Sequence, residues 1–183
     1  MIEFKNVRFS YGEKQILKDF NLKINDGERI CLYGESGRGK TTVLRLIMGL
    51  EKPLSGTVTV NGGISAVFQE DRLLPFKTVN ENIEFVSNTE NREKILSALN
   101  LSAERDSYPS ALSGGMARRV SIARALSKNN DIYIFDEPFT GLDSRNINDA
   151  AKIINEITNG KTVVCVLHEK SNAEKLGCRI IDL

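Results

Sequence analysis

The sequence has almost no net charge and no long apolar run. Its 183 residues include 25 Lys and Arg against 24 Asp and Glu, a formal net charge of +1. A strong global field that would attract nucleic acid or an anionic membrane surface is therefore absent. No apolar run approaches the roughly 20 residues that span a bilayer, and residues 1–5 lack the apolar region of a signal peptide. We expect no nucleic-acid partner, and we expect any role at a membrane to depend on a partner protein.

Cysteine and histidine are also scarce. The three cysteines, Cys31, Cys165 and Cys178, lie far apart, without the spacing of a metal site or a disulfide framework. The first two fall within apolar, strand-like runs. We expect buried, reduced thiols, as is typical of cytosolic proteins. The only histidine, His168, directly follows an apolar run.

One glycine-rich stretch carries the strongest signal. Residues 34–42 read GESGRGKTT, which fits the phosphate-loop pattern of a glycine, four free positions and Gly-Lys-Ser/Thr. An apolar run precedes this phosphate loop, and apolar residues at helical spacing follow it, so a strand-to-helix turn is expected. Backbone N–H groups in such a turn bind phosphates at the positive end of a helix. The expected nucleotide-binding residues are Gly34, Glu35, Ser36, Gly37, Arg38, Gly39, Lys40, Thr41 and Thr42. A chance match is the alternative, with odds of about 1% in a chain of this length.

Carboxylates follow another apolar run at residues 132–135. In a chain with a phosphate loop, Asp136 at the end of a buried strand suits a water-bridged contact to Mg²⁺, to which the Thr41 hydroxyl would also bind. Glu137 could polarise a water for attack on the γ-phosphate, while Lys40 would neutralise the β- and γ-phosphates. A solvated Asp-Glu turn is the alternative interpretation.

Three further polar or aromatic residues end predicted strands. Gln69 and His168 each follow an apolar run, and ligands collect at the carboxyl ends of parallel strands, so both are expected near the phosphates. Taken alone, a glutamine there is more often a loop residue and a histidine more often structural. Tyr11 ends a strand ahead of the phosphate loop, where its ring could stack on a base or simply terminate the strand.

A second glycine-rich segment, LSGG at residues 112–115, precedes a helix expected from about residue 117 to 126. Ser113, Gly114 and Gly115 at a helix N-terminus would form a second anion-binding end. A plain helix cap is the alternative.

The order of the predicted elements indicates an α/β fold. We expect one domain over residues 1–183, with a P-loop NTPase core in which helices flank a parallel sheet. Short alternating segments separated by glycine turns before residue 30 predict an N-terminal antiparallel β subdomain. Residues 72–110 are helical in pattern, with a capping box at residues 78–81, and predict a small helical insertion.

Together these motifs resemble the nucleotide-binding domain of the ABC ATPase family over essentially the whole chain. The LSGG segment between the phosphate loop and Asp136-Glu137, with Gln69 and His168 in order, is specific to that family. The resemblance implies that Tyr11 stacks on adenine and that Gln69 couples the metal and the γ-phosphate to a membrane partner. It also implies that Glu137 is the general base and that His168 contacts the γ-phosphate. Asp143 would lie in a loop that crosses the dimer.

The resemblance also implies cofactors and partners. ATP and Mg²⁺ are expected, with Thr41, Gln69 and Asp136 around the metal. A second nucleotide-binding domain, expected to be an identical chain in the ATP-bound state, would contribute residues 113–115, and transmembrane permease subunits would place the protein on the cytoplasmic face of the membrane. Residues 68–76, FQEDRLLPF, are similar to ATP-binding subunits of nitrate, sulfonate and taurine importers.

The chain departs from the family in two respects. Met116 stands where the family usually has glutamine, which we expect to alter the rim of the site without abolishing it. The chain is also short: 28 residues separate Lys40 from Gln69, and we expect no regulatory domain of the kind found in some sugar-importer ATPases. The function that the resemblance implies is an ATP-binding and ATP-hydrolysing subunit that energises a membrane transporter, expected to be a bacterial solute importer, by ATP-driven dimerisation. The alternatives are a soluble ABC ATPase that acts on ribosomes or DNA, and a P-loop kinase or GTPase, which would leave the LSGG segment without a role.

Overall fold

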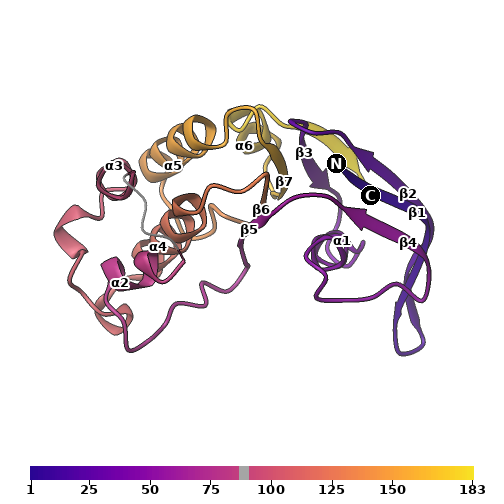
Figure 1. Cartoon of the computed structure of the whole chain (residues 1–183), viewed down its shortest axis with the longest axis horizontal. Helices are drawn as coiled ribbons and strands as arrows, with labels where there is room; N and C mark the ends of the chain where they lie inside the picture. The colour runs from indigo at the N-terminus through magenta and orange to yellow at the C-terminus, as the bar shows by residue number, and fades with distance from the viewer. Residues whose placement is uncertain (87–90) are drawn as a thin grey trace.

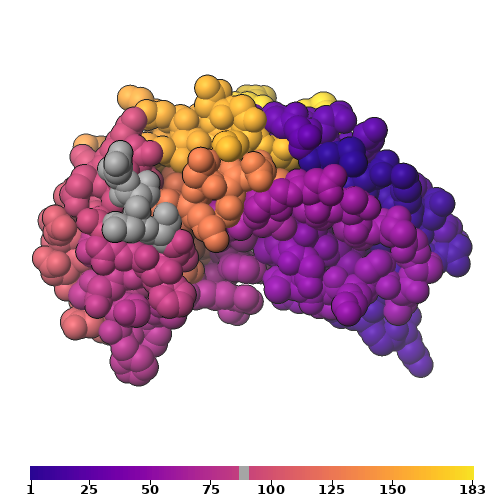
Figure 2. Space-filling model, in the orientation of Figure 1, coloured from indigo at the N-terminus to yellow at the C-terminus, as the bar shows by residue number. Residues whose placement is uncertain are grey.

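Two β-sheets of different kinds organise the fold in the computed structural model, which describes residues 1–86 and 91–183. The antiparallel sheet has the strand order β2-β1-β4, and the parallel sheet has the order β5-β6-β7-β3-β8. In Figure 1 the antiparallel sheet and α1 lie at one end of the molecule and α2, α3 and α4 at the other, with β5, β6 and β7 between them. The space-filling view shows a hollow between the two ends (Figure 2).

The antiparallel sheet is built from the N-terminal region and one later strand. β1 (Ile2–Tyr11) pairs with both β2 (Lys14–Ile24) and β4 (Ser55–Val60). Gly12 has a φ of 57° in the tight turn between β1 and β2, a conformation that glycine adopts without steric cost. The antiparallel strands predicted before residue 30 are confirmed.

The parallel sheet is buried on both faces along its three central strands, and its two outer strands are only partly buried. It contains β3 (Arg29–Tyr33), β5 (Ile64–Val67), β6 (Ile132–Asp136), β7 (Thr162–Val166) and β8 (Arg179–Asp182). In β6, Ile134 faces the hydrophobic layer formed with α1 and the antiparallel sheet, whereas Phe135 faces the layer formed with the other helices. Burial on both faces explains why these strands are continuous apolar runs. Because the strands are parallel, their carboxyl ends share one edge.

The helices divide between the two faces of the parallel sheet. The described residues form α1 (Lys40–Ile47), α2 (Val79–Glu84), α3 (Arg92–Ala98), α4 (Gly114–Ser127), α5 (Ser144–Ile157) and α6 (Lys170–Lys175), with 3₁₀ turns at Ser102–Glu104 and Pro109–Ala111. α1 contributes buried side chains to the layer shared with the antiparallel sheet, and the other helices contribute to the opposite layer. The predicted α/β class, with a helix-flanked parallel sheet and an antiparallel subdomain, is confirmed.

Two local predictions about helix starts have different outcomes. The capping box is present: the Thr78 hydroxyl accepts from the Glu81 N–H at 3.2 Å, and the Glu81 carboxylate accepts from the Thr78 N–H at 2.8 Å. The helix predicted from about residue 117 instead begins at Gly114, because the Ser113 hydroxyl accepts from the Met116 N–H and caps the helix there. The LSGG segment thus enters the helix itself.

The predicted insertion at residues 72–110 contains α2, α3 and both 3₁₀ turns among its described residues. Its status as a separate insertion, and the assignment of residues 1–183 to one domain, stay predictions. Within the part of the chain that the structure describes, no helix is both long enough and apolar enough to cross a membrane.

Candidate functional site

A cavity of about 290 Å³ lies at the carboxyl edge of the parallel sheet. It is lined by Tyr11, Lys14, Ile16, Ser36, Gly37, Gly39, Lys40, Thr41, Thr42, Gln69, Glu137, Val166 and His168. These residues come from β1, β2, the phosphate loop, the start of α1 and the segments that follow β5, β6 and β7. The hairpin of β1 and β2, the phosphate loop with α1, and the ends of β5, β6 and β7 are five separate stretches of the chain that the fold brings to one cavity.

The phosphate loop has a backbone that requires glycine. Gly39 is the N-cap of α1 and has a φ of 93°. A Cβ at this position would lie 2.8 Å from Cγ2 of Ile16 in β2, so both the conformation and the packing exclude a side chain. The Lys40 side chain is buried, and its Nζ donates to the carbonyls of Gly34 at 2.7 Å and Glu35 at 2.8 Å. The ammonium charge is thus held over the loop.

Asp136 is a buried carboxylate with an open oxygen. It ends β6 with 4% exposure, and its Oδ1 has no hydrogen-bond partner among the described residues. Burial raises the pKa of Asp136 and the neighbouring charge of Glu137 raises it further, whereas a hydrogen bond with the Thr41 side chain opposes both. A carboxylate and a hydroxyl are the oxygen donors that Mg²⁺ prefers. An open, buried carboxylate oxygen at the phosphate loop therefore fits a Mg²⁺ ion.

Glu137 is turned towards the cavity by a strained backbone. Its φ of 52° is unusual for a residue with a side chain, and its N–H donates to the carbonyl of Val166 at 3.0 Å. Its Oε1 lies 2.8 Å from Nε2 of His168, whose side chain is 62% exposed. The Thr140 hydroxyl approaches the other carboxylate oxygen at 3.4 Å. A carboxylate held in this way by two neighbouring strand ends is placed to accept a proton at the cavity.

Tyr11 lies at the mouth of the cavity. Its ring packs edge-on against Phe9, with centroids 4.8 Å apart. Its hydroxyl donates to the Glu51 carboxylate and accepts from Arg45, both at 3.4 Å. The residue is still 43% exposed, so part of the ring remains accessible for stacking.

The loop that carries Gln69 is held by two arginines that the sequence analysis missed. Arg118 of α4 donates to the carbonyls of Phe68, at 2.6 Å, and Gln69, and its Nε lies 3.2 Å from Oδ1 of Asp71. Arg124, also of α4, donates to the carbonyls of Asp71 at 3.1 Å and Arg72 at 2.8 Å. Arg118 is buried. The helix that begins in the LSGG segment therefore fixes the backbone on which Gln69 is mounted.

No sequence signal marked these two arginines. They lie six residues apart in a helix that contains a third arginine, Arg119, which donates instead to the carbonyls of Leu99 and Asn100. Which arginine reaches the Gln69 loop depends on how α4 packs against β5, and this packing is visible only in three dimensions.

The LSGG segment lies outside the cavity. Ser113 and Gly114 are exposed at the start of α4, and none of residues 113–115 is among the described residues that line the cavity. Gly115 packs against the loop before α5: a Cβ there would lie 3.1 Å from the carbonyl oxygen of Gly141. Asp143 in this loop caps α5 by accepting from the Asn146 N–H at 2.8 Å. The structure thus groups Gln69, Asp136, Glu137 and His168 with the phosphate loop, and the LSGG segment with the Asp143 loop.

The chain is similar to known proteins over most of its length. The profile of the family described as ABC transporter matches residues 17–140. The chain is 38% identical to the aliphatic sulfonates import ATP-binding protein SsuB of Corynebacterium glutamicum, with 97% of the chain and 77% of that protein covered. It is 35% identical to the arginine transport ATP-binding protein ArtM of Bacillus subtilis, with coverage of 99% and 86%.

A solved structure is similar over the whole chain. The dimeric, post-hydrolysis ATP-binding cassette MJ0796 bound to ADP and Pi superposes with a TM-score of 0.86 at 33% identity and covers 100% of this chain and 94% of that one.

Proposed function

Because the chain belongs to the ABC transporter family, we propose that the cavity at the phosphate loop binds ATP with Mg²⁺ and that the protein drives a bacterial solute importer. It is an ATP-binding, ATP-hydrolysing transporter subunit. The observation that carries the residue assignments is the convergence of Lys40, Glu137 and His168 on one cavity.

Phosphate binding is assigned to residues 34–42. Lys40 supplies a positive charge, and the N–H groups at the start of α1 supply donors at the positive end of a helix dipole. Tyr11 stacks on the adenine from the mouth of the cavity. This arrangement orients the γ-phosphate towards the ends of β6 and β7, where Glu137 and His168 lie.

Thr41, Asp136 and Gln69 would hold Mg²⁺. The open Oδ1 of Asp136 supports this assignment, since binding a cation would compensate the buried carboxylate. When bound, the ion supplies positive charge that neutralises the phosphate oxygens.

Glu137 is the proposed general base. Its carboxylate accepts a proton from a water molecule, which thereby becomes the nucleophile for in-line attack on the γ-phosphorus. The contact of 2.8 Å with His168 orients the carboxylate and leaves the exposed imidazole beside the position of the terminal phosphate. General-base catalysis contributes about 10²–10⁴ to a rate.

The site is completed by a second chain. The exposed N-terminus of α4 carries backbone N–H groups and a serine hydroxyl suited to phosphate, yet it lies outside the cavity of its own chain. In a head-to-tail dimer, residues 113–115 of one chain cover the ATP bound by the other. Met116 is half-buried, and we propose that it affects only the rim of that contact.

Permease subunits are the proposed membrane partners, which places the protein on the cytoplasmic face of the membrane. The segment after Gln69 presents an apolar contact: Phe76 is 91% exposed. Similarity to subunits named for sulfonate, arginine and glutamine transport supports an importer.

Trapping the dimer tests this proposal. Glu137→Gln keeps the size of the side chain but removes the proton acceptor, so ATP should bind without turnover and the chain should elute as a dimer only with ATP and Mg²⁺. Glu174→Gln, at an exposed position of α6, is the matched control and should turn over normally and stay largely monomeric. A monomeric Glu137→Gln variant with saturating ATP would overturn the shared site.

A further inference from the structure

Three thiols that take no part in ATP chemistry meet on one face of the parallel sheet. Cys31 in β3 pairs in register with Cys165 in β7, and Cys178 lies one residue before β8. All three belong to the hydrophobic layer beneath α5 and α6. The Sγ atoms of Cys165 and Cys178 are 3.7 Å apart, and all three cysteines are free. Residues 13 positions apart in sequence are thus in direct contact through their sulfur atoms.

The contacting thiols differ in accessibility. Cys165 is 0% exposed, whereas Cys178 is only partly buried. A small oxidant from solvent therefore reaches Cys178 first. Cys165 lies deeper, in β7, and Cys31 lies in β3, the strand between β7 and β8.

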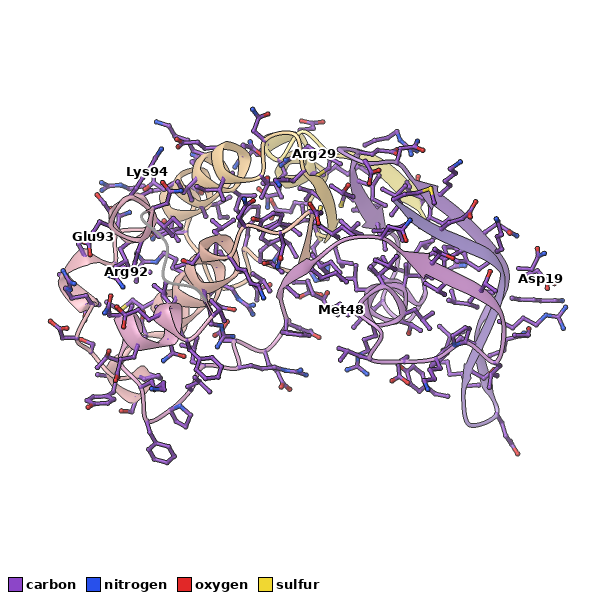
Figure 3. All side chains as sticks on the ribbon, viewed as in Figure 1. Asp19, Arg29, Met48, Arg92, Glu93 and Lys94 are labelled. Carbon is purple, nitrogen blue, oxygen red and sulfur yellow. The ribbon has the colours of Figure 1, made fainter. Side chains whose placement is uncertain are left out.

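Charge also distinguishes them. Arg29 lies beside α6 (Figure 3), where it donates to the carbonyl of Leu176 at 2.8 Å and to the Thr158 hydroxyl at 2.8 Å. A hydrogen bond with Cys165 lowers the pKa of Cys178, burial opposes this effect, and the charge of Arg29 adds to it, so that the net direction is downward. Hydrogen bonds with Cys178 and Cys31 hold the pKa of Cys165 well above its usual range. The reactive thiolate form is therefore favoured at Cys178.

We propose that Cys178 and Cys165 form an oxidation site that takes a hydroperoxide and closes to a reversible disulfide. The Cys178 thiolate attacks the terminal peroxide oxygen, the O–O bond breaks, and Cys178 becomes a sulfenic acid as hydroxide, or the alkoxide of an organic hydroperoxide, leaves. The Cys165 sulfur then attacks the Cys178 sulfur and displaces its hydroxyl group, which leaves as water with the Cys165 proton. For hydrogen peroxide, two thiols and one peroxide give one disulfide and two waters. Closing the sulfur contact to a bond of about 2.05 Å requires an approach of roughly 1.7 Å.

The disulfide would enclose a functional part of the chain. The segment between Cys165 and Cys178 contains His168 and the whole of α6. A crosslink would fasten both ends of this segment and restrict the unfolded chain, which stabilises the folded form. We therefore expect the melting temperature to rise by several degrees on oxidation and to return after reduction.

Peptide mapping of the full chain tests the proposal. After treatment with hydrogen peroxide and blocking of free thiols, non-reducing mass spectrometry should find Cys165 linked to Cys178, with a loss of two hydrogen atoms that dithiothreitol reverses. Cys31→Ser should retain the link and the shift in melting temperature, and Cys178→Ser should lose both. Overoxidation of Cys178 without a link, or a link that includes Cys31, would overturn it. Mapping of the wild-type chain alone decides this if a variant misfolds, and it does not depend on ATP turnover.

Discussion

The chain has two helix N-termini suited to phosphate, and they differ in what surrounds them. The N-terminus of α1 opens into a cavity, with Gly39 in a left-handed conformation as its cap. The N-terminus of α4 is exposed, and its cap, Ser113, accepts a hydrogen bond within its own helix. The first end lies against β2 and the strand ends of the parallel sheet, the second against the loop at Gly141.

The groups suited to chemistry lie at the α1 end, whereas the α4 end offers groups suited to binding phosphate. Asp136, Glu137 and His168, the groups that could hold a metal or move a proton, all lie at the α1 end. The α4 end offers N–H donors and a hydroxyl, but among the described residues none of these three groups adjoins it, so we assign its function to the site of a second chain. The variants below test this comparison, from the largest expected effect to the smallest.

Ser113→Arg should affect turnover without affecting the binding of ATP by a single chain. An arginine at this exposed cap would obstruct a partner while leaving the cavity of its own chain unchanged. Loss of donors that act on the transferred phosphate typically costs about 10²–10³ in rate, and we expect kcat to fall by that factor. The Kd of the monomer for ATP should stay within about twofold of the wild-type value. Ser110→Arg, three residues earlier and also exposed, should remain near wild type. An equal loss in both variants would contradict a specific role for the α4 end.

The same substitution at the two ends should have opposite effects on stability. Gly39→Ala meets Ile16 at 2.8 Å in a left-handed conformation, so it should cost about 2–3 kcal/mol of unfolding free energy and weaken ATP binding. Gly114→Ala has open space and a helical position, so it should leave stability unchanged or raise it by up to about 1 kcal/mol. Urea denaturation measures both. A Gly114→Ala variant as unstable as Gly39→Ala would mean that the α4 end is packed in its own chain.

Arg118 links the two ends, and its replacement should separate kcat from KM. Lysine keeps the charge but lacks the rigid, planar fork with which the guanidinium bonds two carbonyls and Asp71, so the Gln69 backbone should lose its orientation. We expect kcat to fall about tenfold, as for the loss of one or two hydrogen bonds, with KM for ATP little changed. Arg92→Lys, which alters an arginine paired with Glu84 away from the loop, is the control. An equal fall in kcat in Arg92→Lys would show that the effect of Arg118→Lys is general destabilisation.

Asp136→Asn should stabilise the nucleotide-free chain by a few degrees although it impairs turnover. A raised carboxyl pKa in the folded state means that ionisation opposes folding, so the stabilising contribution of Asp136 is fully present below the unfolded pKa and is lost as pH rises through the folded pKa. The variant should therefore melt above wild type at neutral pH. The difference should shrink as pH falls towards 3.8, the ordinary aspartate value. A pH-independent difference would show that Asp136 is not the titrating group.

The sequence alone was sufficient to predict which polar residues lie at the carboxyl ends of the parallel strands. Gln69, Asp136 and His168 each follow an apolar run, and parallel pairing brings the ends of such runs to one edge whatever the remaining packing. The strand-to-helix turn at residues 34–39 could also be predicted, because its glycines are required locally by backbone geometry.

Other features depend on distant contacts. Glu137 has a left-handed backbone, and its N–H donates to the carbonyl of Val166 in a neighbouring strand. The arginine contacts to the Gln69 loop depend on how α4 packs. The start of α4 was placed too late because glycine is a poor helix former, whereas the Ser113 cap favours a start at Gly114.

Mixing two inactive variants tests the shared site most directly. Lys40→Ala disables the α1 end and Ser113→Arg the α4 end, so a heterodimer of the two has one intact site. Random mixing of a symmetric dimer should restore about a quarter of wild-type ATPase activity. A chain that carries both Lys40→Ala and Ser113→Arg should instead reduce wild-type activity when it is mixed with the wild-type chain, because neither site of that heterodimer is intact. No recovery from the two single variants, in mixtures shown to form heterodimers, would contradict a site built from two chains.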